Sequence, residues 1–179
     1  MPLRLSRNLD EVCYPFILER SYLCDFEVLT DELCALIGAV LNCLPAGADD
    51  IRADLQQLQP LAFHLNGSLR GRMAVDESDL QWLNARLDHY RTELRGHAHR
   101  FVLPRGPLPA AQLHQARSAA KKAIRALVRV DEEGREVPPI LPRLCNLMCN
   151  FFFFLALVLN QRQGFEETAF VSKSYGPPD

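Results

Sequence analysis

The sequence lacks the features that mark secreted, membrane-spanning or nucleic-acid-binding proteins. Its first residues show no basic segment followed by an apolar one, so we expect no secretion signal. Its longest apolar run, residues 151–159, is far shorter than the roughly 20 residues that cross a bilayer. Its formal net charge is −2, which favours neither nucleic acid nor an anionic membrane surface. We therefore expect a cytoplasmic protein without nucleic-acid or membrane partners.

Paired cysteines and convincing metal-ligand clusters are also missing. The six cysteines are Cys13, Cys24, Cys34, Cys43, Cys145 and Cys149, and no two form a CxxC pair. Their apolar, helix-like contexts favour reduced, buried thiols. Cys145 and Cys149 lie one helical turn apart and leave a soft-metal site open, although two small buried side chains explain them better. His97 and His99, near His89, lack a carboxylate or thiol at ligand spacing, so we expect no metal site.

Strand alternation, internal repeats and low-complexity linkers are absent, and apolar residues recur at helical spacing instead. The predicted helices cover residues 30–44, 49 to beyond 65, 76–94, about 109–130 and 140 to about 163. Pro60 should kink or interrupt the second, and the fifth is apolar almost all round, which predicts a central position. Residues 1–28 form an N-terminal segment without a clean period, and residues 172–179 a flexible tail. The sequence predicts one all-α domain over residues 1–179, built as a five-helix bundle.

The most informative stretch is FVLPRGPLPAAQLHQARSAAKKAIR, residues 101–125. A loop rich in proline and glycine leads directly into the predicted fourth helix. That helix carries Arg117, Lys121, Lys122 and Arg125 about one turn apart. A helix start followed by cations at this spacing is a suitable seat for an anionic ligand.

The same stretch resembles the ATP:cob(I)alamin adenosyltransferases of the propanediol-utilisation type. Their signature there reads roughly F-[IV]-L-P-x-G-x(6)-L-H-x-A-R-[TS]-x-x-R-R-A-E-R. The positions that fit it in register are Phe101, Leu103, Pro104, Gly106, Leu113, His114, Ala116, Arg117, Ser118, Ala123 and Arg125. Residues 30–38, 51–58 and 146–156 resemble further motifs of the family, in the right order. The resemblance implies a five-helix bundle that assembles as a homotrimer with active sites between subunits.

The resemblance also implies roles for individual residues. ATP would be held with magnesium by Arg117 and Asn146, the two residues expected to be catalytic, together with Lys121. Lys122, Arg125 and Asn150 would complete the cofactor-binding set on the same two helices.

The corrinoid, a cobalamin, would sit next to ATP on a hydrophobic face. Phe101 takes the position of the aromatic side chain that displaces the lower axial base of cobalt. Asp31 and Arg117 fall where the family has an acid–arginine pair that bridges subunits.

The ATP side departs from the family pattern. Leu9 stands where the N-terminal loop needs glycine, and residues 13–17 replace its glycine-rich continuation. A backbone that wraps phosphates needs small residues, because its N–H groups must approach closely. Ile124 replaces an acidic residue, Leu147 an arginine and Asn150 an aspartate. Lysines at 121 and 122, where the family has arginines, supply charge without the bidentate fork. These departures predict weak use of ATP.

Three functions follow as hypotheses. In the first, the chain binds a corrinoid at a subunit interface without efficient adenosyl transfer, and serves a corrinoid-dependent enzyme or a paralogous subunit. In the second, it is a divergent but active enzyme that converts cob(I)alamin to adenosylcobalamin with ATP and magnesium. In the third, it is a non-catalytic scaffold or partner subunit.

Overall fold

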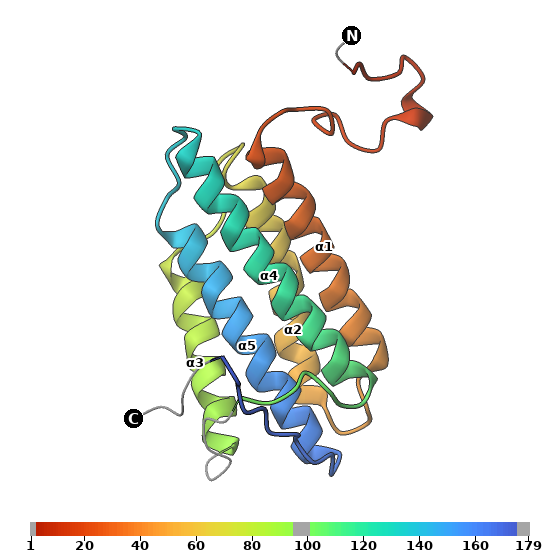
Figure 1. Cartoon of the computed structure of the whole chain (residues 1–179), viewed down its shortest axis with the longest axis vertical. Helices are drawn as coiled ribbons and strands as arrows, with labels where there is room; N and C mark the ends of the chain where they lie inside the picture. The colour runs from red at the N-terminus through yellow and green to blue at the C-terminus, as the bar shows by residue number, and fades with distance from the viewer. Residues whose placement is uncertain (1–2, 95–100, 175–179) are drawn as a thin grey trace.

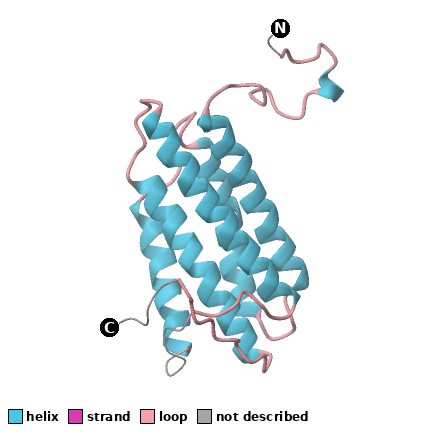
Figure 2. Cartoon of the chain, in the orientation of Figure 1, coloured by secondary structure: helices cyan, strands magenta, loops and turns pink. Residues whose placement is uncertain are grey.

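The chain folds as a bundle of long helices (Figure 1). The computed structural model describes residues 3–94 and 101–174 of the 179-residue chain. Within these residues there is no β-strand, and a single isolated β-bridge joins Val102 to Ala169 (Figure 2). The helices in this described part are the 3-10 helix η1 (Leu9–Glu11), α1 (Tyr22–Cys43), α2 (Asp49–Gly67), α3 (Glu77–Glu93), α4 (Leu108–Glu132) and α5 (Ile140–Arg162). The predicted all-α bundle of five long helices is confirmed.

The helices pack in an order that differs from their order along the chain. α1 packs against α2 and α4, and α5 packs against α4 and α3. In Figure 1, α4 and α5 therefore lie side by side across the face towards the viewer, with α1 and α3 flanking them. The core between these helices contains large, fully buried side chains, among them Phe26, Tyr90, Phe151 and Phe152. This arrangement leaves the outer faces of α4 and α5 available for a ligand or another chain.

The fifth helix is buried on one side only. Half of its most apolar stretch is buried inside the bundle, so the expectation of a central position holds for one face. Leu147, Phe153, Phe154 and Leu157 on the other face are only partly buried. The helix is long and apolar enough to cross a membrane by length and composition, but core helices of bundles pass the same test. A half-open apolar face suits contact with another chain.

The first helix begins earlier than its apolar period predicts, at Tyr22 rather than Thr30. Ser21 caps it, because its Oγ accepts a hydrogen bond from the Leu23 N–H. The carboxylate of Glu133, just past the end of α4, accepts from Ser21 Oγ and from the Tyr22 N–H. A cap supplied from so far along the chain cannot be read from local periodicity.

The second helix continues through Pro60, which the sequence predicts as a kink or break. Proline removes the hydrogen bond that its N–H would donate to the carbonyl of Gln56. Both residues are exposed, so water can satisfy that carbonyl. Pro60 is therefore accommodated on the solvent side of α2.

Candidate functional site

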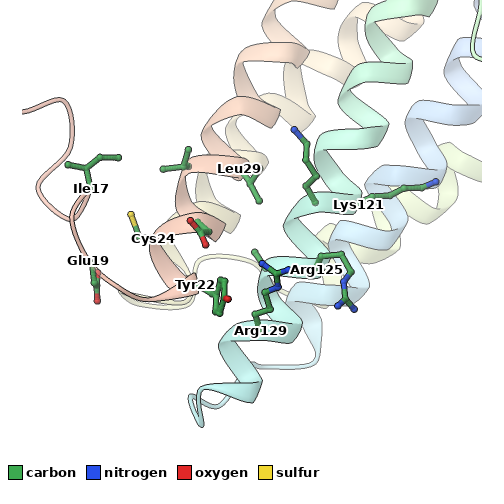
Figure 3. Close-up of a pocket in the computed structure, with 12 residues that line it drawn as sticks. Ile17, Glu19, Tyr22, Cys24, Leu29, Lys121, Arg125 and Arg129 are labelled. Atoms are coloured by element: carbon green, nitrogen blue, oxygen red, sulfur yellow. The ribbon is translucent and has the colours of Figure 1, made fainter.

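A cleft with a volume of about 600 Å³ opens between α1, α4 and the N-terminal segment (Figure 3). Its lining residues are Ile17, Glu19, Tyr22, Cys24, Asp25, Val28, Leu29, Lys121, Lys122, Arg125, Ala126 and Arg129. Figure 3 shows Ile17, Glu19 and Cys24 on one side and Arg125 and Arg129 on the other. Lys121, Lys122 and Arg125, which the sequence assigns to ligand binding, are thus brought into one cleft.

Two of the cleft's cations already have neighbours. Lys122 Nζ lies 3.0 Å from Glu32 Oε2 on α1. The guanidinium carbon of Arg129 lies 4.8 Å from the centre of the Tyr22 ring, a cation–π contact. Arg129 is not among the ligand-binding residues that the sequence predicts, although its position four residues after Arg125 places it on the same helix face.

The other two cations carry positive charge that no described residue neutralises in an ion pair. Lys121 and Arg125 make no ion pair with any residue that the structure describes. Asp25 lies in the cleft, whereas the carboxylate of Glu19 is held by Arg70, 2.5 Å away. The α4 side of the cleft therefore presents net positive charge, which attracts an anionic group.

A second cluster lies between α4 and α5 and centres on Phe153. The guanidinium carbon of Arg117 is 5.4 Å from the centre of this ring, and the His114 ring centre is 6.4 Å from it. His114 is 5% exposed, and neither ring nitrogen has a hydrogen-bond partner among the described residues. Burial, and then the charge of Arg117, lower the pKa of His114 from 6.5 to about 4. The imidazole is therefore neutral at pH 7.

Arg117 itself is incompletely satisfied. Its Nε is buried and has no hydrogen-bond partner within the described part of the chain. Asp31 is exposed on α1 and does not pair with Arg117 inside this subunit. The acid–arginine pair that the resemblance implies is one between subunits, which a single chain does not test.

Asn146 and Asn150 lie on the exposed side of α5, in a groove against α3. Asn146 Nδ2 donates to the carbonyl of Pro142, 2.8 Å away, within its own helix. Phe153 lies seven residues after Asn146 and three after Asn150, so the three share one face of α5. This face contacts Arg117 of α4 through Phe153, while the two asparagines line the groove against α3.

Phe101 lies in the loop before α4 with 83% of its surface exposed. The backbone of this loop is nevertheless fixed. The carbonyl of Phe101 accepts from the Phe170 N–H at 2.7 Å, beside the bridge between Val102 and Ala169. Figure 1 shows this loop and the C-terminal segment crossing near the same end of the bundle. An exposed aromatic ring on a fixed backbone is a suitable ligand contact.

One subunit does not bring all the predicted site residues together. Leu108 opens α4 and Arg125 lies 17 residues later, so about 25 Å of helix separates them at a rise of 1.5 Å per residue. Phe101 precedes Leu108 in the chain and lies at that opening end. The cationic cleft and the aromatic loop are therefore two sites along one helix, with Arg117 between them.

The N-terminal segment does not form a phosphate-binding loop in this structure. Asn8 caps η1, and the side chains of Ser6 and Asn8 both donate to the carboxylate of Glu11. No residue described before α1 has a positive φ angle. A loop that wraps phosphate with its N–H groups relies on such conformations. The chain folds locally around its own side chains instead.

The base of this segment is anchored to the bundle by Arg70. Its Nε and Nη2 donate to the carboxylate of Glu27, which is buried on α1, and Nη2 also donates to Glu19. Its guanidinium lies 3.8 Å from the centre of the Phe16 ring. The segment is therefore fixed beside the cationic cleft although its tip is exposed.

Ile124 and Leu147 take apolar positions where the family signature has charge. Both side chains are partly buried and pack against the core. Leu147 also lines the groove that contains Asn146 and Asn150. Both side chains therefore contribute to packing in this structure.

The remaining candidate groups give no site among the described residues. His97 and His99 lie outside them. Within them, no three His, Cys, Asp or Glu side chains gather closely enough to hold a metal ion. All six cysteines are free, and the expectation of buried thiols is wrong for Cys13, which is exposed, and only partly right for Cys43.

Comparison with curated proteins adds two relatives. The chain is 31% identical over 141 residues to a corrinoid adenosyltransferase from Bacillus subtilis (strain 168), covering 75% of this chain and 72% of the relative. It is 36% identical over 138 residues to a cobalamin adenosyltransferase from Cupriavidus metallidurans, with the same coverage of 75% and 72%.

Solved structures give the same class of fold. Variants of a PduO-type ATP:corrinoid adenosyltransferase from Lactobacillus reuteri, complexed with cobalamin and ATP, match with TM-scores of 0.76 and 0.77 at 20% identity. They cover 85% and 86% of this chain, which covers 85% and 88% of theirs. A third variant, complexed with ATP, matches with a TM-score of 0.78 at 21% identity, covering 93% of this chain and 94% of that one.

The bundle with a cationic α4 thus defines an adenosyltransferase-like helical protein. The family described as Cobalamin adenosyltransferase matches residues 26–159, well over half of the chain. The chain belongs to this family.

Proposed function

We propose that this protein binds a corrinoid on its α4–α5 face, at the boundary between subunits of a homotrimer, and uses ATP poorly. The observation that carries the proposal is the unsatisfied hydrogen-bond donor of Arg117. Its Nε is buried beside Phe153 and has no partner within the described part of the chain. A buried donor without a partner costs about 1–3 kcal/mol, and more when it is charged. A neighbouring subunit or a ligand is the natural source of the missing acceptor.

A cyclic trimer would supply such an acceptor. Asp31 is exposed on α1 and α4 carries Arg117, so a head-to-tail contact can place one subunit's acid against the next subunit's arginine. The partly exposed apolar face of α5 would supply the hydrophobic contacts of this interface. Light scattering should report three chains, and a monomer at micromolar concentration would contradict the proposal.

The α4–α5 face also has the character that a corrinoid needs. Phe101 presents an exposed ring, and Phe153 and Leu157 offer partly buried apolar surface. Relatives named for corrinoid and cobalamin chemistry support this choice of ligand. When bound, the corrinoid would supply the cobalt centre, while Phe101 would exclude the axial base from its lower side and Arg117 would orient the complex.

Replacing Phe101 with Ala tests this role. Cob(II)alamin should change its absorption and electron paramagnetic resonance spectra on binding the wild type, because the axial ligand is excluded. F101A should lose that change. Phe63 is an exposed phenylalanine on α2, 53% accessible, so F63A is the matched control and should behave like wild type. Identical spectra for free and protein-mixed cobalamin would overturn the proposal.

Active adenosyl transfer is the second candidate, and the cationic cleft favours it. Lys121 and Arg125 remain available for a triphosphate. The N-terminal segment, however, offers no positive-φ loop, and Leu147 and Ile124 have replaced charges. Calorimetry with ATP–magnesium should give at least about tenfold weaker binding than an intact relative, from the loss of one or more charge-assisted contacts. Rapid formation of adenosylcobalamin with a reductant would establish the enzyme instead.

The cell compartment is part of the same proposal. All six cysteines are free thiols in the structure. Free thiols, including the exposed Cys13, are typical of the reducing cytoplasm. We place the protein there, with a corrinoid-dependent enzyme or a paralogous subunit as the recipient of its ligand.

A further inference from the structure

Asn160, in the last turn of α5, makes polar contacts to two other segments. Its side chain is completely buried. Its Nδ2 donates to the carbonyl of Arg105 at 2.9 Å and to Glu167 Oε1 at 2.7 Å. Arg105 belongs to the loop before α4, and Glu167 to the segment that follows α5. One buried amide therefore fastens both segments to the end of α5.

Gly106 shows how closely this contact is built. Its φ angle is +142°, which side-chain-bearing residues rarely adopt. A Cβ at this position would lie 2.1 Å from Asn160 Oδ1, far inside van der Waals contact. The loop approaches Asn160 only because residue 106 has no side chain.

The two fastened segments also pair with each other. The Leu103 N–H donates to the carbonyl of Thr168 at 2.9 Å, and the Phe170 N–H donates to the carbonyl of Phe101 at 2.7 Å. The Phe165 N–H, where the segment leaves α5, donates to the Asn160 carbonyl at 2.8 Å. The backbone of Phe101 is therefore held by the C-terminal segment, and that segment is held by Asn160.

We infer that Asn160 and Glu167 are positioning residues that hold the backbone of Phe101 in the geometry its ligand requires. Neither residue contacts the proposed corrinoid itself. Both act through the backbone of the loop 101–106 and of the segment 165–170. The inference rests on the proposed function for its ligand, but the fastening itself is a property of the free protein. It assigns the C-terminal segment a role in the ligand site.

The buried contact between Asn160 and Glu167 also indicates which substitution would preserve it. Asn160 Oδ1 and Glu167 Oε2 are both buried and have no partner among the described residues. Burial raises the pKa of Glu167, whereas the hydrogen bond from Asn160 lowers it. Asn160 Nδ2 needs only an acceptor at Glu167 Oε1. The amide oxygen of glutamine provides that acceptor, so E167Q should preserve the contact that E167A removes.

The first test uses hydrogen exchange in the ligand-free protein. N160A and E167A should speed exchange of the Leu103 and Phe170 amides by about tenfold, as expected for the loss of a buried hydrogen bond. E167Q should remain close to wild type. Asn66 donates to the Glu27 carbonyl and to Thr30 on α1, far from this loop in the chain. N66A is therefore a control that weakens the bundle without changing these two amides.

The second test repeats the cob(II)alamin titration with the same variants. N160A and E167A should reduce the spectral change towards the F101A result, whereas E167Q and N66A should keep it. G106A should act like N160A, because its Cβ would displace Asn160.

The outcomes distinguish the fastening of the loop by Asn160 from the binding of the proposed ligand. Unchanged exchange in both N160A and E167A would overturn the inference whatever the ligand does. Faster exchange with an unchanged spectral response would overturn the positioning role. If the wild-type protein does not change the cob(II)alamin spectra, the proposed function and the positioning role are both overturned. The exchange rates would still decide whether Asn160 fastens the loop.

Discussion

The loop before α4 and the N-terminal segment beside the far end of α4 are both irregular, yet they are held in different ways. The loop matches the family signature through Phe101, Pro104 and Gly106, and a fully buried asparagine binds it. The N-terminal segment, residues 3–21, contains no glycine and is anchored at its base by one arginine. Each region adjoins one of the two sites proposed along α4.

The difference separates two kinds of change in a binding site. At the loop, positive φ and close backbone contact are retained, so the geometry for an apolar ligand remains. At the far end, cations remain on α4 but the backbone that would wrap a phosphate does not. Charge without an enclosing backbone attracts an anion and holds it weakly. The comparison therefore predicts a stronger corrinoid site than ATP site.

The largest expected effect comes from Arg70, which anchors the N-terminal segment. R70A would leave the carboxylate of Glu27, 3% exposed, without its cation. Stranding one partner of a buried pair costs about 3–5 kcal/mol. The free energy of unfolding, measured with urea, should fall by that amount.

The matched control for R70A removes the outer partner instead. Glu19 is about one third exposed, so E19Q should cost less than about 1 kcal/mol. Equal losses for R70A and E19Q would show that the anchor is a surface pair, and the contrast between the two irregular regions would then disappear.

The next effect concerns acid sensitivity in the half of α4 nearer the loop. The pKa of His114 falls from 6.5 to about 4 on folding because the imidazole is buried, with a smaller contribution from the charge of Arg117. The unfolded chain therefore takes up this proton first as the pH falls. The stability that His114 contributes is complete above pH 6.5 and is lost between pH 6.5 and 4. At about 1.4 kcal/mol per pKa unit, the loss reaches about 3 kcal/mol.

A comparison of variants separates the contribution of His114 to this pH dependence from that of other titrating groups. H114L has no proton to bind, so its free energy of unfolding should fall less than that of wild type over the same pH window. H89L changes a histidine on the surface of α3, whose side chain is exposed, and should keep the wild-type slope. Parallel curves for H114L and wild type would show that His114 is accessible to solvent protons in the folded state.

The local parts of this architecture could be predicted from the sequence. α2 to α5 follow apolar periods bounded by proline, glycine and acidic caps, and each begins or ends within a few residues of its prediction. The cations of α4 share a cleft because their spacing fixes their face. The start of α1 is not apparent from its apolar period. Ser21 is its local cap signal, and Glu133 adds contacts from a distant part of the chain.

Contacts between distant segments could not be predicted in the same way. The role of Asn160 is not visible in the local sequence, because the carbonyl of Arg105 to which it donates lies 55 residues away in the chain. The only local sign was Gly106, whose need for a positive φ hinted at a close approach.

A smaller effect is expected from the cleft cations. Lys121 and Arg125 lack ion-pair partners among the described residues, so removing both should weaken inorganic triphosphate by about tenfold, near the lower end for charge-assisted contacts. Calorimetry at low salt measures this change. Arg72 is exposed in the turn after α2, and R72A should leave the affinity unchanged. If R72A weakened binding as much as K121A/R125A, the attraction would come from overall charge rather than from the cleft.

The smallest effect tests whether Lys122 belongs to the same anion site. Its Nζ is held by Glu32, and both side chains are about half exposed, so E32Q should change the unfolding free energy by less than about 1 kcal/mol. The same change releases Lys122 into the cleft and should strengthen triphosphate binding about twofold at low salt, with the gain vanishing at high salt. D88N is the matched control, because it also removes one negative charge and one exposed ion pair, with Arg91 on α3. A gain shared by D88N would be a general charge effect. A gain confined to E32Q would show that Lys122 can bind an anion in the cleft and that Glu32 of α1 normally neutralises it. Weak anion binding at this end of α4 would then result from the missing backbone loop.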